Sequence, residues 1–305
     1  MPPATASLEH HIAADELDAL IARARAEDMG PAGLDVTSEA TIDADRSGHG
    51  QIVARQAGTV AGLALLERVA AAYDPAMVIT LHAADGEAFE PGSLLAECHG
   101  RLRPLLAMER VALNFVGHLS GVATLTAAYV ARVAGAGEAA RPARICDTRK
   151  TIPGLRALQK YAVACGGGLN HRMGLNDAVL IKDNHLASVA PGELGAAVAA
   201  AIERARQIQP RLELVEVEVD TLEQLDRVLG AGATMILLDN MTPAELARAV
   251  AMRDQRGTGE LLEASGGVSL ATVAEIAATG VDRISVGALT HSAPALDVAL
   301  DVDAG

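Results

Sequence analysis

Short apolar runs alternate with longer amphipathic segments through the second half of the chain. The apolar runs have strand length and each ends at polar or glycine residues; they lie at 143–146, 178–181, 214–219, 235–238, 261–264 and 283–284. The segments between the later runs have helical periodicity and span 192–209, 221–229, 243–253 and 269–279. Thr221 and Thr242 are suitable N-cap residues for two of these helices. The alternation predicts a parallel α/β barrel, whose functional groups collect at the carboxyl ends of the strands.

An open, doubly wound parallel sheet would also produce this alternation and stays open as an alternative. In such a sheet a glycine-rich G-x-G-x-x-G turn opens the helix that follows the dinucleotide-binding strand. No such turn follows a predicted strand in this sequence, which disfavours the doubly wound fold.

The first half of the chain has shorter elements of mixed type. Helices are predicted at 15–25 and 63–72, and strands at 52–54, 78–81 and 94–98, with a turn at Asp85-Gly86. A long helix is predicted from Pro104 to about Ala134, with Gly135-Ala-Gly137 at its end. This half is therefore expected to form an α+β domain.

Composition excludes several functional classes. The chain has 305 residues, 2% aromatic residues and a formal net charge of −14, so general nucleic-acid binding is not expected. Its three cysteines lack CxxC spacing, which argues against a disulfide framework or a zinc site. The stretch 116–131 has only sixteen uncharged residues, and the first residues lack a basic start before an apolar run, so neither a membrane span nor a signal peptide is expected. We expect a soluble, cytoplasmic protein. Cys165 is predicted to be a packed thiol rather than a nucleophile.

Positive charge gathers in one segment of this acidic chain. Residues 141–185 hold eight Lys or Arg against three acids, a net charge of +5. Arg149, Lys150 and Lys182 follow predicted strands directly, whereas Arg141, Arg156 and Lys160 are predicted to lie on solvated helix faces. His171 and Arg172 come just after the glycine run 166–168. Such a local cluster indicates a small polyanionic ligand.

Glycines and carboxylates at the other strand ends extend this prediction. Ser265-Gly266-Gly267 and Ser285-Val286-Gly287 follow the last two strands, where backbone N–H groups can hold a phosphate. Glu218 and Asp239 are single carboxylates near strand ends, suited to Mg²⁺ or to ribose hydroxyls. Three other acids, Asp177, Glu216 and Asp220, are predicted to be caps or salt-bridge partners.

Several motifs together closely resemble the nicotinate-nucleotide pyrophosphorylase family, also called quinolinate phosphoribosyltransferase. The motifs are Asp147-Thr-Arg-Lys-Thr-Ile-Pro-Gly-Leu-Arg156, Lys160-Tyr-Ala-Val163, Gly166-Gly-Gly-Leu-Asn-His-Arg-Met-Gly-Leu-Asn-Asp177 and Leu180-Ile-Lys-Asp-Asn-His185. Weaker agreement covers most of the chain, including Glu27-Asp-Met-Gly30, Asp35-Val-Thr-Ser38, Glu109-Arg-Val-Ala-Leu-Asn114 and Glu263-Ala-Ser-Gly266.

The resemblance implies an incomplete α/β barrel over residues 116–290 and an N-terminal α/β sandwich over residues 1–115, joined by 291–305. It implies transfer of phosphoribose from 5-phosphoribosyl-1-diphosphate to quinolinate with Mg²⁺, giving nicotinate mononucleotide, CO₂ and pyrophosphate. It also implies a homodimer, or an assembly of dimers, in which Arg110 reaches the partner's site.

By position in the family, the dicarboxylate and diphosphate pocket would be lined by Arg110, Thr148, Arg149, Lys150, His171, Arg172 and Lys182. Glu218 and Asp239 would hold the ribose hydroxyls and the Mg²⁺ complex. Ser265–Gly267 and Ser285–Gly287 would bind the 5-phosphate. Lys150, Lys182, Glu218 and Asp239 would be the catalytic set.

The sequence departs from the family pattern at two places. The turn 30–35 looks longer than usual, and Gly267 stands where an asparagine is expected. Three other functions remain open at this stage. They are a related phosphoribosyltransferase-like protein associated with molybdate transport, with another acceptor; a Schiff-base aldolase barrel that uses Lys182 as nucleophile; and a non-catalytic phosphosugar sensor.

Overall fold

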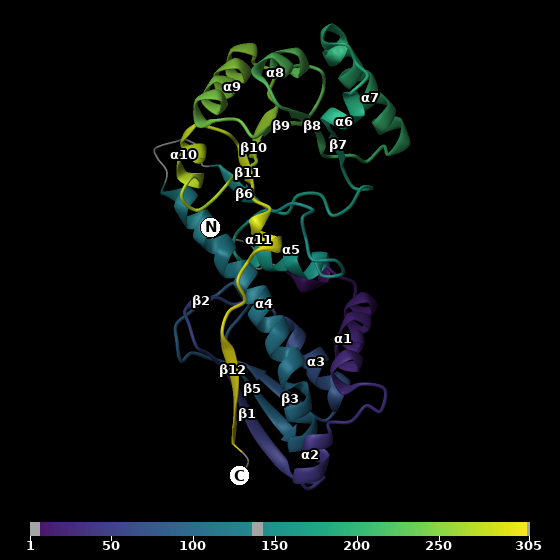
Figure 1. Ribbon diagram of the computed structural model, residues 1–305, viewed down its shortest axis with the longest axis vertical. Coiled ribbons are helices and arrows are strands. Elements are labelled where there is room, and N and C mark those ends of the chain that lie inside the picture. Colours follow the sequence, from purple (N-terminus) through teal and green to yellow (C-terminus); the bar gives the residue numbers. More distant parts are fainter. Residues whose placement is uncertain (1–6, 136–142, 304–305) are drawn as a thin grey trace. The chain divides into compact units, whose positions relative to one another are not determined.

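The computed structural model describes residues 7–135 and 143–303, which group into two compact units (Figure 1). The first unit takes the described residues up to Ala127, Ile152–Gly167 and the described residues from Leu289 onward. The second takes the described residues of Ala128–Thr151 together with Gly168–Ala288. The domain boundary at residues 115 and 116 stays a prediction. Gly137 and Arg141, for which we predicted a helix end and a solvated face, lie outside the described residues.

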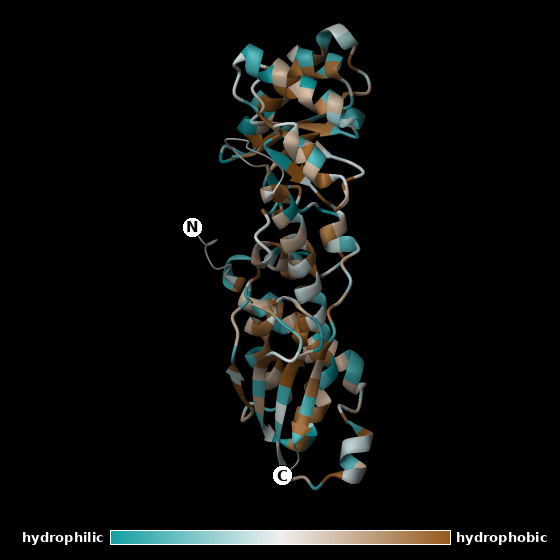
Figure 2. Cartoon of the chain, turned by 90° about the vertical axis from the view of Figure 1, so that its left-hand side faces the viewer, coloured by the Kyte–Doolittle hydropathy of each residue, from teal (hydrophilic) through white to brown (hydrophobic). Residues whose placement is uncertain are grey.

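The first unit is built on a four-stranded antiparallel sheet in the order β12-β1-β5-β3. The strands are β1 (Ser47–Ala54), β3 (Val78–Leu81), β5 (Leu94–Arg101) and β12 (Val298–Asp303). Gly50, Ile52 and Ala54 of β1 are buried and the residues between them are partly exposed; this alternation appears as brown and teal bands along the strands (Figure 2). The sheet therefore has one buried and one open face. A short second pair joins β2 (Gly58–Thr59) to β4 (Ala88–Phe89).

Helix α4 (Leu102–Ala134) packs against the buried face of this sheet. A Cβ added at Gly48 would lie 2.8 Å from Leu102 Cδ1, and one at Gly50 would lie 3.3 Å from Leu105 Cδ2, so these glycines allow the close approach. By length and composition, α4 is the one described helix that could cross a membrane, but 61% of its most apolar window is buried inside the protein. That burial is what a core helix shows.

The other helices of the first unit are short. They comprise η1 (Leu8–His10), α1 (Ala14–Met29), α2 (Val36–Thr41), η2 (Leu63–Leu65), α3 (Leu66–Tyr73) and α5 (Arg156–Cys165). The Asp35 carboxylate caps α2 by accepting hydrogen bonds from the backbone N–H groups of Thr37 and Ser38. Helix α11 (Ala288–His291) spans the point where the two units divide.

Our prediction of a solvated face for Lys160 was wrong. Lys160 lies in α5 and only 1% of its surface is exposed. The neighbouring Gln159 is also buried; its side-chain amide lies 3.0 Å from His118 Nε2 and donates to the Thr290 carbonyl at 2.6 Å. Polar side chains such as Gln159 and Lys160 are typical of solvated positions, which explains why the sequence did not reveal that this part of α5 is buried.

The second unit contains a six-stranded parallel sheet in the order β6-β11-β10-β9-β8-β7. The strands are β6 (Arg144–Cys146), β7 (Val179–Ile181), β8 (Val215–Val219), β9 (Met235–Asp239), β10 (Leu261–Ser265) and β11 (Arg283–Ser285). Cys146 of β6 forms a single parallel bridge to Leu169. The mixed α/β fold with a parallel sheet confirms the predicted fold class, and within the described residues no ladder joins β6 to β7.

Helices connect the strands in the predicted alternation. They are α6 (Asp183–Leu186), η3 (Pro191–Glu193), α7 (Leu194–Ile208), α8 (Leu222–Val228), α9 (Pro243–Arg256) and α10 (Val273–Ala278). Thr221 and Thr242 cap α8 and α9 as predicted, each in a reciprocal capping box with the residue three positions later. Helix α10 begins four residues later than predicted, because Ser269 and Thr272 hydrogen-bond each other in a turn before it.

Candidate active site

The carboxyl edge of the parallel sheet carries most of the residues predicted to form the site. Lys182 follows β7, Glu218 lies near the end of β8, and Asp239 and Ser265 end β9 and β10. Register places Glu218 opposite Leu237 and Asp239 opposite Ser265. Because residues in register point to the same side, and residues two apart do so too, Glu218, Asp239 and Ser265 share one face of the sheet.

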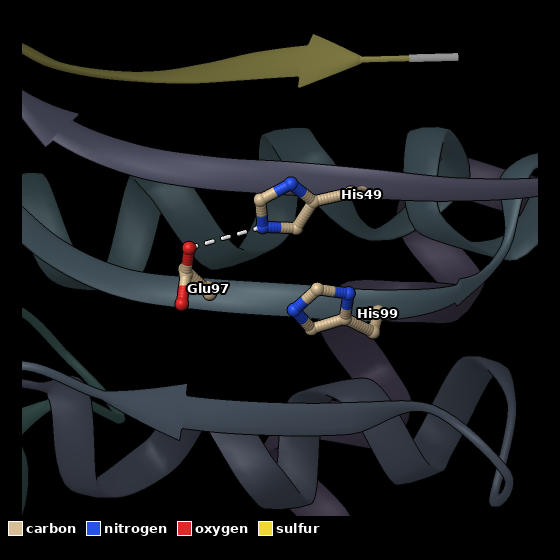
Figure 3. A group of neighbouring side chains, drawn as sticks. All are labelled: His49, Glu97 and His99. Atoms are coloured by element: carbon tan, nitrogen blue, oxygen red, sulfur yellow. Dashed lines mark ion pairs between the residues drawn. The ribbon is translucent and has the colours of Figure 1, made fainter. Parts of the chain in front are cut away.

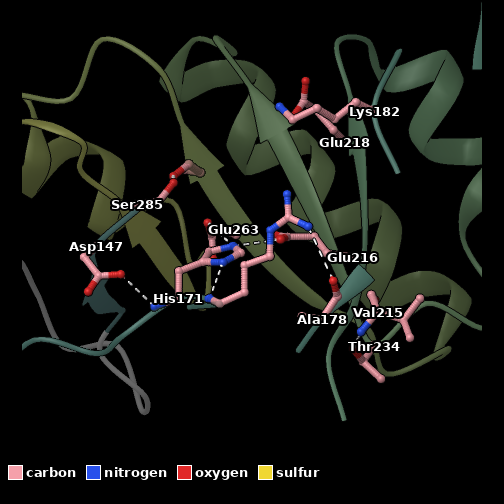
Figure 4. A network of polar contacts seen from close by, with 12 residues as sticks. Asp147, His171, Ala178, Lys182, Val215, Glu216, Glu218, Thr234, Glu263 and Ser285 are labelled. Atoms are coloured by element: carbon pink, nitrogen blue, oxygen red, sulfur yellow. Dashed lines mark hydrogen bonds and ion pairs between the residues drawn. The ribbon is translucent and has the colours of Figure 1, made fainter. Parts of the chain in front are cut away.

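Lys182 and Glu218 form an ion pair across the ends of β7 and β8. Lys182 Nζ lies 2.6 Å from Glu218 Oε2, and the Lys182 side chain is 42% exposed whereas that of Glu218 is 11% exposed. Figure 4 shows the two side chains meeting away from the rest of the network. Glu218 also lines a cavity of about 380 Å³ together with Asp220, Thr221 and Gln224. The carboxylate of the pair therefore borders a ligand-sized space, whose lining does not include Lys182.

Asp239 is linked to the glycine turn that follows β10. Its Oδ2 accepts a hydrogen bond from Asn240 Nδ2 at 2.6 Å, and the Asn240 N–H donates to the Ser265 carbonyl at 2.8 Å. Gly266 has φ +93°, and an added Cβ there would collide with the Asn240 side chain. Only glycine fits at that position.

Gly267 keeps space for a larger residue. It has φ +62°, a value that asparagine tolerates, and an added Cβ would meet no described atom within 4 Å. The Asn240 side chain lies against the neighbouring Gly266, and its amide nitrogen donates to Asp239.

The turn after β6 presents backbone and side-chain donors together. The backbone N–H of Lys150 donates to Thr148 Oγ1 at 3.0 Å, a local hydrogen bond that stabilises the turn. Lys150 is exposed, whereas Arg149 is partly buried. Arg149 Nε is buried and donates to no acceptor within the described ranges. Arg149 also lowers the pKa of Arg172, after burial as the larger cause. Two neighbouring guanidinium groups of this kind favour an anionic ligand.

His171 is held by a buried network beneath this turn. The backbone N–H of His171 donates to Asp147 Oδ1 at 2.8 Å, and Asn170 Nδ2 donates to Asp147 Oδ2 at 2.7 Å. The Arg172 N–H donates to His171 Nδ1 at 2.7 Å, which leaves the ring proton on Nε2. His171 Nε2 then lies 2.8 Å from Glu216 Oε2 (Figure 4). With the proton on Nε2, His171 donates a hydrogen bond to Glu216, and the contact is a salt bridge only when the ring is protonated.

Glu263, a second buried carboxylate, lies behind this pair. The side chains of Glu216 and Glu263 have 0% exposure, and Glu263 Oε1 is 3.7 Å from His171 Nε2. Neither Glu263 oxygen accepts a hydrogen bond at normal distance from another described side chain. Burial, and then the nearby Glu216 carboxylate, raise the pKa of Glu263 to about 7. Sequence reasoning did not assign Glu263 a role, although a charged residue inside the apolar run Leu261–Ala264 is a signal that could have done so.

This pKa predicts a pH-dependent stability that a Glu263→Gln substitution removes. The folded-state pKa lies above the ordinary value of 4.5, so the native state binds the extra proton between about pH 4.5 and 7. The free energy of unfolding of the wild type should therefore fall, relative to Glu263→Gln, by up to about 3 kcal/mol as the pH rises through that window. Denaturant unfolding of the wild type and of Glu263→Gln at pH 5 and pH 8 measures this difference in the free energy of unfolding. Glu275→Gln, on the exposed side of α10, is the control; an equal pH response in both variants contradicts the prediction.

The structure does not gather every predicted residue in one cavity. His171 and Arg172 line a cavity of about 410 Å³ with Asp177, Thr234 and Arg283, separate from the space beside Glu218. Asp177 accepts hydrogen bonds from the Met173 and Gly174 N–H groups, which makes it a loop cap as predicted. Ser285 ends β11, followed by Val286 and Gly287.

Arg110 belongs to α4 in the first unit. Its side chain is 63% exposed and lies 3.6 Å from Glu109. It lines a cavity of about 330 Å³ with Glu27, Asp28 and His118. Its contact with substrate, like the roles of the other site residues, stays a prediction.

Cys165 has the character of a packed thiol. It is buried, and burial raises its pKa to about 12. Cys98 and Cys146 are likewise free and buried. A thiol with so high a pKa is almost entirely protonated at neutral pH, so Cys165 is a poor nucleophile.

A parallel α/β sheet with cations, carboxylates and glycine turns along its carboxyl edge defines the α/β-barrel class of enzymes that handle phosphorylated substrates. Residues 122–301 match the C-terminal domain of quinolinate phosphoribosyl transferase, and residues 35–120 match its N-terminal domain. The chain therefore belongs to the quinolinate phosphoribosyltransferase family.

Relatives and solved structures agree with this assignment. The chain is 45% identical over 286 residues to the nicotinate-nucleotide pyrophosphorylase [carboxylating] of Mycobacterium leprae, covering 92% of this chain and 95% of that protein. A probable enzyme of the same name from Bacillus subtilis is 39% identical, with 90% of each chain covered. The crystal structure of NadC from Streptococcus pyogenes superposes with a TM-score of 0.85 at 35% identity, covering 96% of this chain and 98% of that one. The fold is that of a soluble enzyme.

Proposed function

We propose that the chain transfers phosphoribose from 5-phosphoribosyl-1-diphosphate to quinolinate and releases pyrophosphate and CO₂, giving nicotinate mononucleotide. The observation that carries this proposal is the match to both domains of the family over residues 35–120 and 122–301. The relative at 45% identity, from Mycobacterium leprae, is named for the same activity. Both substrates are polyanions, in agreement with the net charge of +5 in residues 141–185 of a chain of net charge −14.

The chemistry has two steps. The quinolinate ring nitrogen attacks the anomeric carbon while the bond to the diphosphate oxygen breaks, so the pair of electrons leaves with pyrophosphate. The bond to the 2-carboxylate then breaks, CO₂ leaves, the electrons return to the pyridinium ring and a proton replaces the lost carbon. In the first step the protein mainly positions the reactants and stabilises the charge on the departing diphosphate.

Residues of the carboxyl edge, together with His171 and Arg172 of the loop before β7, suit these tasks. Arg149 and Lys150 in the turn after β6, with Thr148, would bind substrate anions, and Arg172 and His171 would bind the dicarboxylate. Lys182 would stabilise the departing diphosphate, while Glu218 keeps its ammonium oriented from 2.6 Å away. The turns after β10 and β11 would hold the 5-phosphate on backbone N–H groups.

Glu218 and Asp239 fit a Mg²⁺ ion held mainly through substrate oxygens. Each carboxylate has one oxygen engaged by a neighbouring nitrogen, Glu218 Oε2 by Lys182 and Asp239 Oδ2 by Asn240. The two side chains leave the same face of the sheet, and one or two carboxylates are the usual protein share of such a site. The ion would neutralise the diphosphate, and the two carboxylates would also accept hydrogen bonds from the ribose hydroxyls.

Asp239→Asn is expected to raise the concentration of Mg²⁺ or phosphoribosyl diphosphate required for half-maximal rate about tenfold or more, and that of quinolinate much less. The substitution keeps the size of the side chain but removes the charge on the ribose side of the site, a loss of roughly 1–2 kcal/mol. Initial rates with one substrate varied at a time measure the difference. Equal effects on both substrates would place Asp239 elsewhere in the site.

The assembly and cellular location are further parts of the proposal. We propose a homodimer, or an assembly of dimers, in which Arg110 acts in the partner's site; its 63% exposure on α4 leaves the guanidinium accessible. We also propose a cytoplasmic location, which agrees with three free, buried cysteines.

A spectroscopic assay with quinolinate, phosphoribosyl diphosphate and Mg²⁺ tests the activity, with nicotinate as the competing acceptor. Turnover with nicotinate but not quinolinate would overturn the proposal. The molybdate-associated alternative is not favoured, because relatives at 39–45% identity are named for quinolinate or nicotinate-nucleotide chemistry. A Schiff-base aldolase is also disfavoured, because the Lys182 Nζ that would act as its nucleophile is held in an ion pair with Glu218 at 2.6 Å.

A further inference from the structure

The open face of the sheet in the first unit carries a cluster of histidines around one carboxylate. Register places His49 of β1 opposite His99 of β5, and Gln51 opposite Glu97. His82 follows β3 directly, on the other side of β5. The alternate residues Gly50 and Cys98 are buried on the opposite face, so the cluster side chains share the outward face. None of these residues belongs to the candidate active site.

The side chains of this cluster approach one another closely. The His49 and His99 rings stack with centroids 4.2 Å apart and planes within 10°. His49 Nε2 lies 3.2 Å from Glu97 Oε1 (Figure 3). On the other side of the carboxylate, His82 Nε2 lies 2.8 Å from Glu97 Oε2. One ligand atom each from His49, Glu97 and His99 can be chosen so that all lie within 4.8 Å of one another.

We propose that His49, Glu97 and His99 bind one divalent transition-metal ion of the Zn²⁺ type, with His82 orienting the carboxylate. Two imidazoles and one carboxylate are a ligand set that Zn²⁺ and its neighbours prefer over Mg²⁺ or Ca²⁺. Three protein ligands leave a fourth tetrahedral position for water. His82 is bound to the remaining oxygen of Glu97, the usual arrangement of a residue that positions a metal-binding carboxylate.

Small side-chain rotations complete the geometry. Metal–ligand bonds of about 2.0–2.1 Å put tetrahedral ligand atoms about 3.3 Å apart, so atoms now within 4.8 Å must approach by roughly 1.5 Å at most. His49 and Glu97 have side chains 32% and 22% exposed, and His99 is exposed, so the rings can turn without displacing the core. The β1–β5 ladder already fixes the backbone of the three ligand residues. Metal binding therefore has to order only their side chains, which lowers its cost in conformational entropy.

The surrounding charge favours a cation. Asp303 of β12 lies in register with His49 on the neighbouring strand, and the chain as a whole carries a net charge of −14. Asp301, in register with Gln51, is already paired with Arg55 at 2.5 Å. The site therefore lies beside an acidic side chain in an acidic protein, which favours a cation over an anion.

Titration of the whole, untagged chain with Zn²⁺ and with Co²⁺ tests the site. Calorimetry with Zn²⁺ should give one saturable site per chain, and Co²⁺ should give the visible absorption of a four-coordinate nitrogen and oxygen environment. We expect His49→Gln, His99→Gln and Glu97→Gln each to weaken binding at least tenfold, and His82→Gln to weaken it severalfold with the stoichiometry unchanged. His10→Gln, at an exposed histidine of η1, is the matched control and should bind as the wild type does.

Two results would overturn the proposal. One is the absence of saturable binding in the wild type; the other is equal affinity in His10→Gln and the cluster variants. Thermal melts verify that each variant folds. If a variant does not fold, Co²⁺ added to the wild type still decides the matter, because NMR signals of His49 and His99 should broaden while those of His10 do not. Phosphoribosyl transfer should be unchanged in the cluster variants, so the result does not depend on the proposed function.

Discussion

Replacing Lys150 by methionine is expected to lower turnover by about 10²–10³-fold while leaving the melting temperature unchanged. Removing one preorganised donor to a developing anion has a cost of this size in other enzymes, about 2.7–4 kcal/mol. Lys150 is exposed in the turn after β6, and methionine keeps most of its length and apolar stem. The fold should therefore lose little when the charge is removed.

Steady-state kinetics together with a thermal melt measure these two effects separately. Arg248→Met, an exposed cation on α9, is the matched control and should change neither quantity. A melting temperature that falls in proportion to activity in Lys150→Met would show a structural role. The assignment of Lys150 to the site would then be wrong.

Mixing inactive Arg110→Ala and Lys150→Ala chains should restore up to about a quarter of wild-type activity. If Arg110 acts in the partner's site, each variant alone lacks one cation in every site and loses most of its activity. After subunit exchange at equal amounts, half of the dimers are mixed, and each mixed dimer has one intact site of two, about a quarter overall. The activity would recover because one site of each mixed dimer contains the intact Lys150 of one chain and the intact Arg110 of the other.

Activity measured after exchange, with dimers verified by sedimentation, decides this point. Arg132→Ala, further along α4 and exposed, should keep its activity without mixing. Dimers that exchange fully and yet recover nothing would leave Arg110 as a residue of its own chain. Arg110 would then be a structural residue.

The strands of the parallel sheet could be predicted to within about a residue, because each is a short apolar run that stops abruptly at polar or glycine residues. The run 235–238, for example, became β9 at Met235–Asp239. Site residues at strand ends could be found for the same reason: their order along one edge follows from parallel topology once the strands are placed. Glu218 and Lys182 were selected in this way, and the two lie 2.6 Å apart.

What the sequence concealed were polar residues inside the protein. Lys160 and Gln159 look like solvated helix positions, and only tertiary contacts to His118 and Thr290 account for the burial of Gln159. Glu263 carries no local signal for its closeness to Glu216, because the two lie on strands separated by β9. Strand β12 was also missed, since its pairing partner β1 lies near the other end of the sequence.

The pairing of β12 with β1 affects how the protein folds during translation. As the chain leaves the ribosome, β1 emerges before the second unit, but β12, the strand that covers the outer edge of β1, emerges only after that unit. Throughout most of translation this edge has unpaired backbone groups, which are a template for wrong strand pairing. The first unit can complete its sheet only after the second has been synthesised, so nascent chains stalled before residue 298 should be held by chaperones or aggregate.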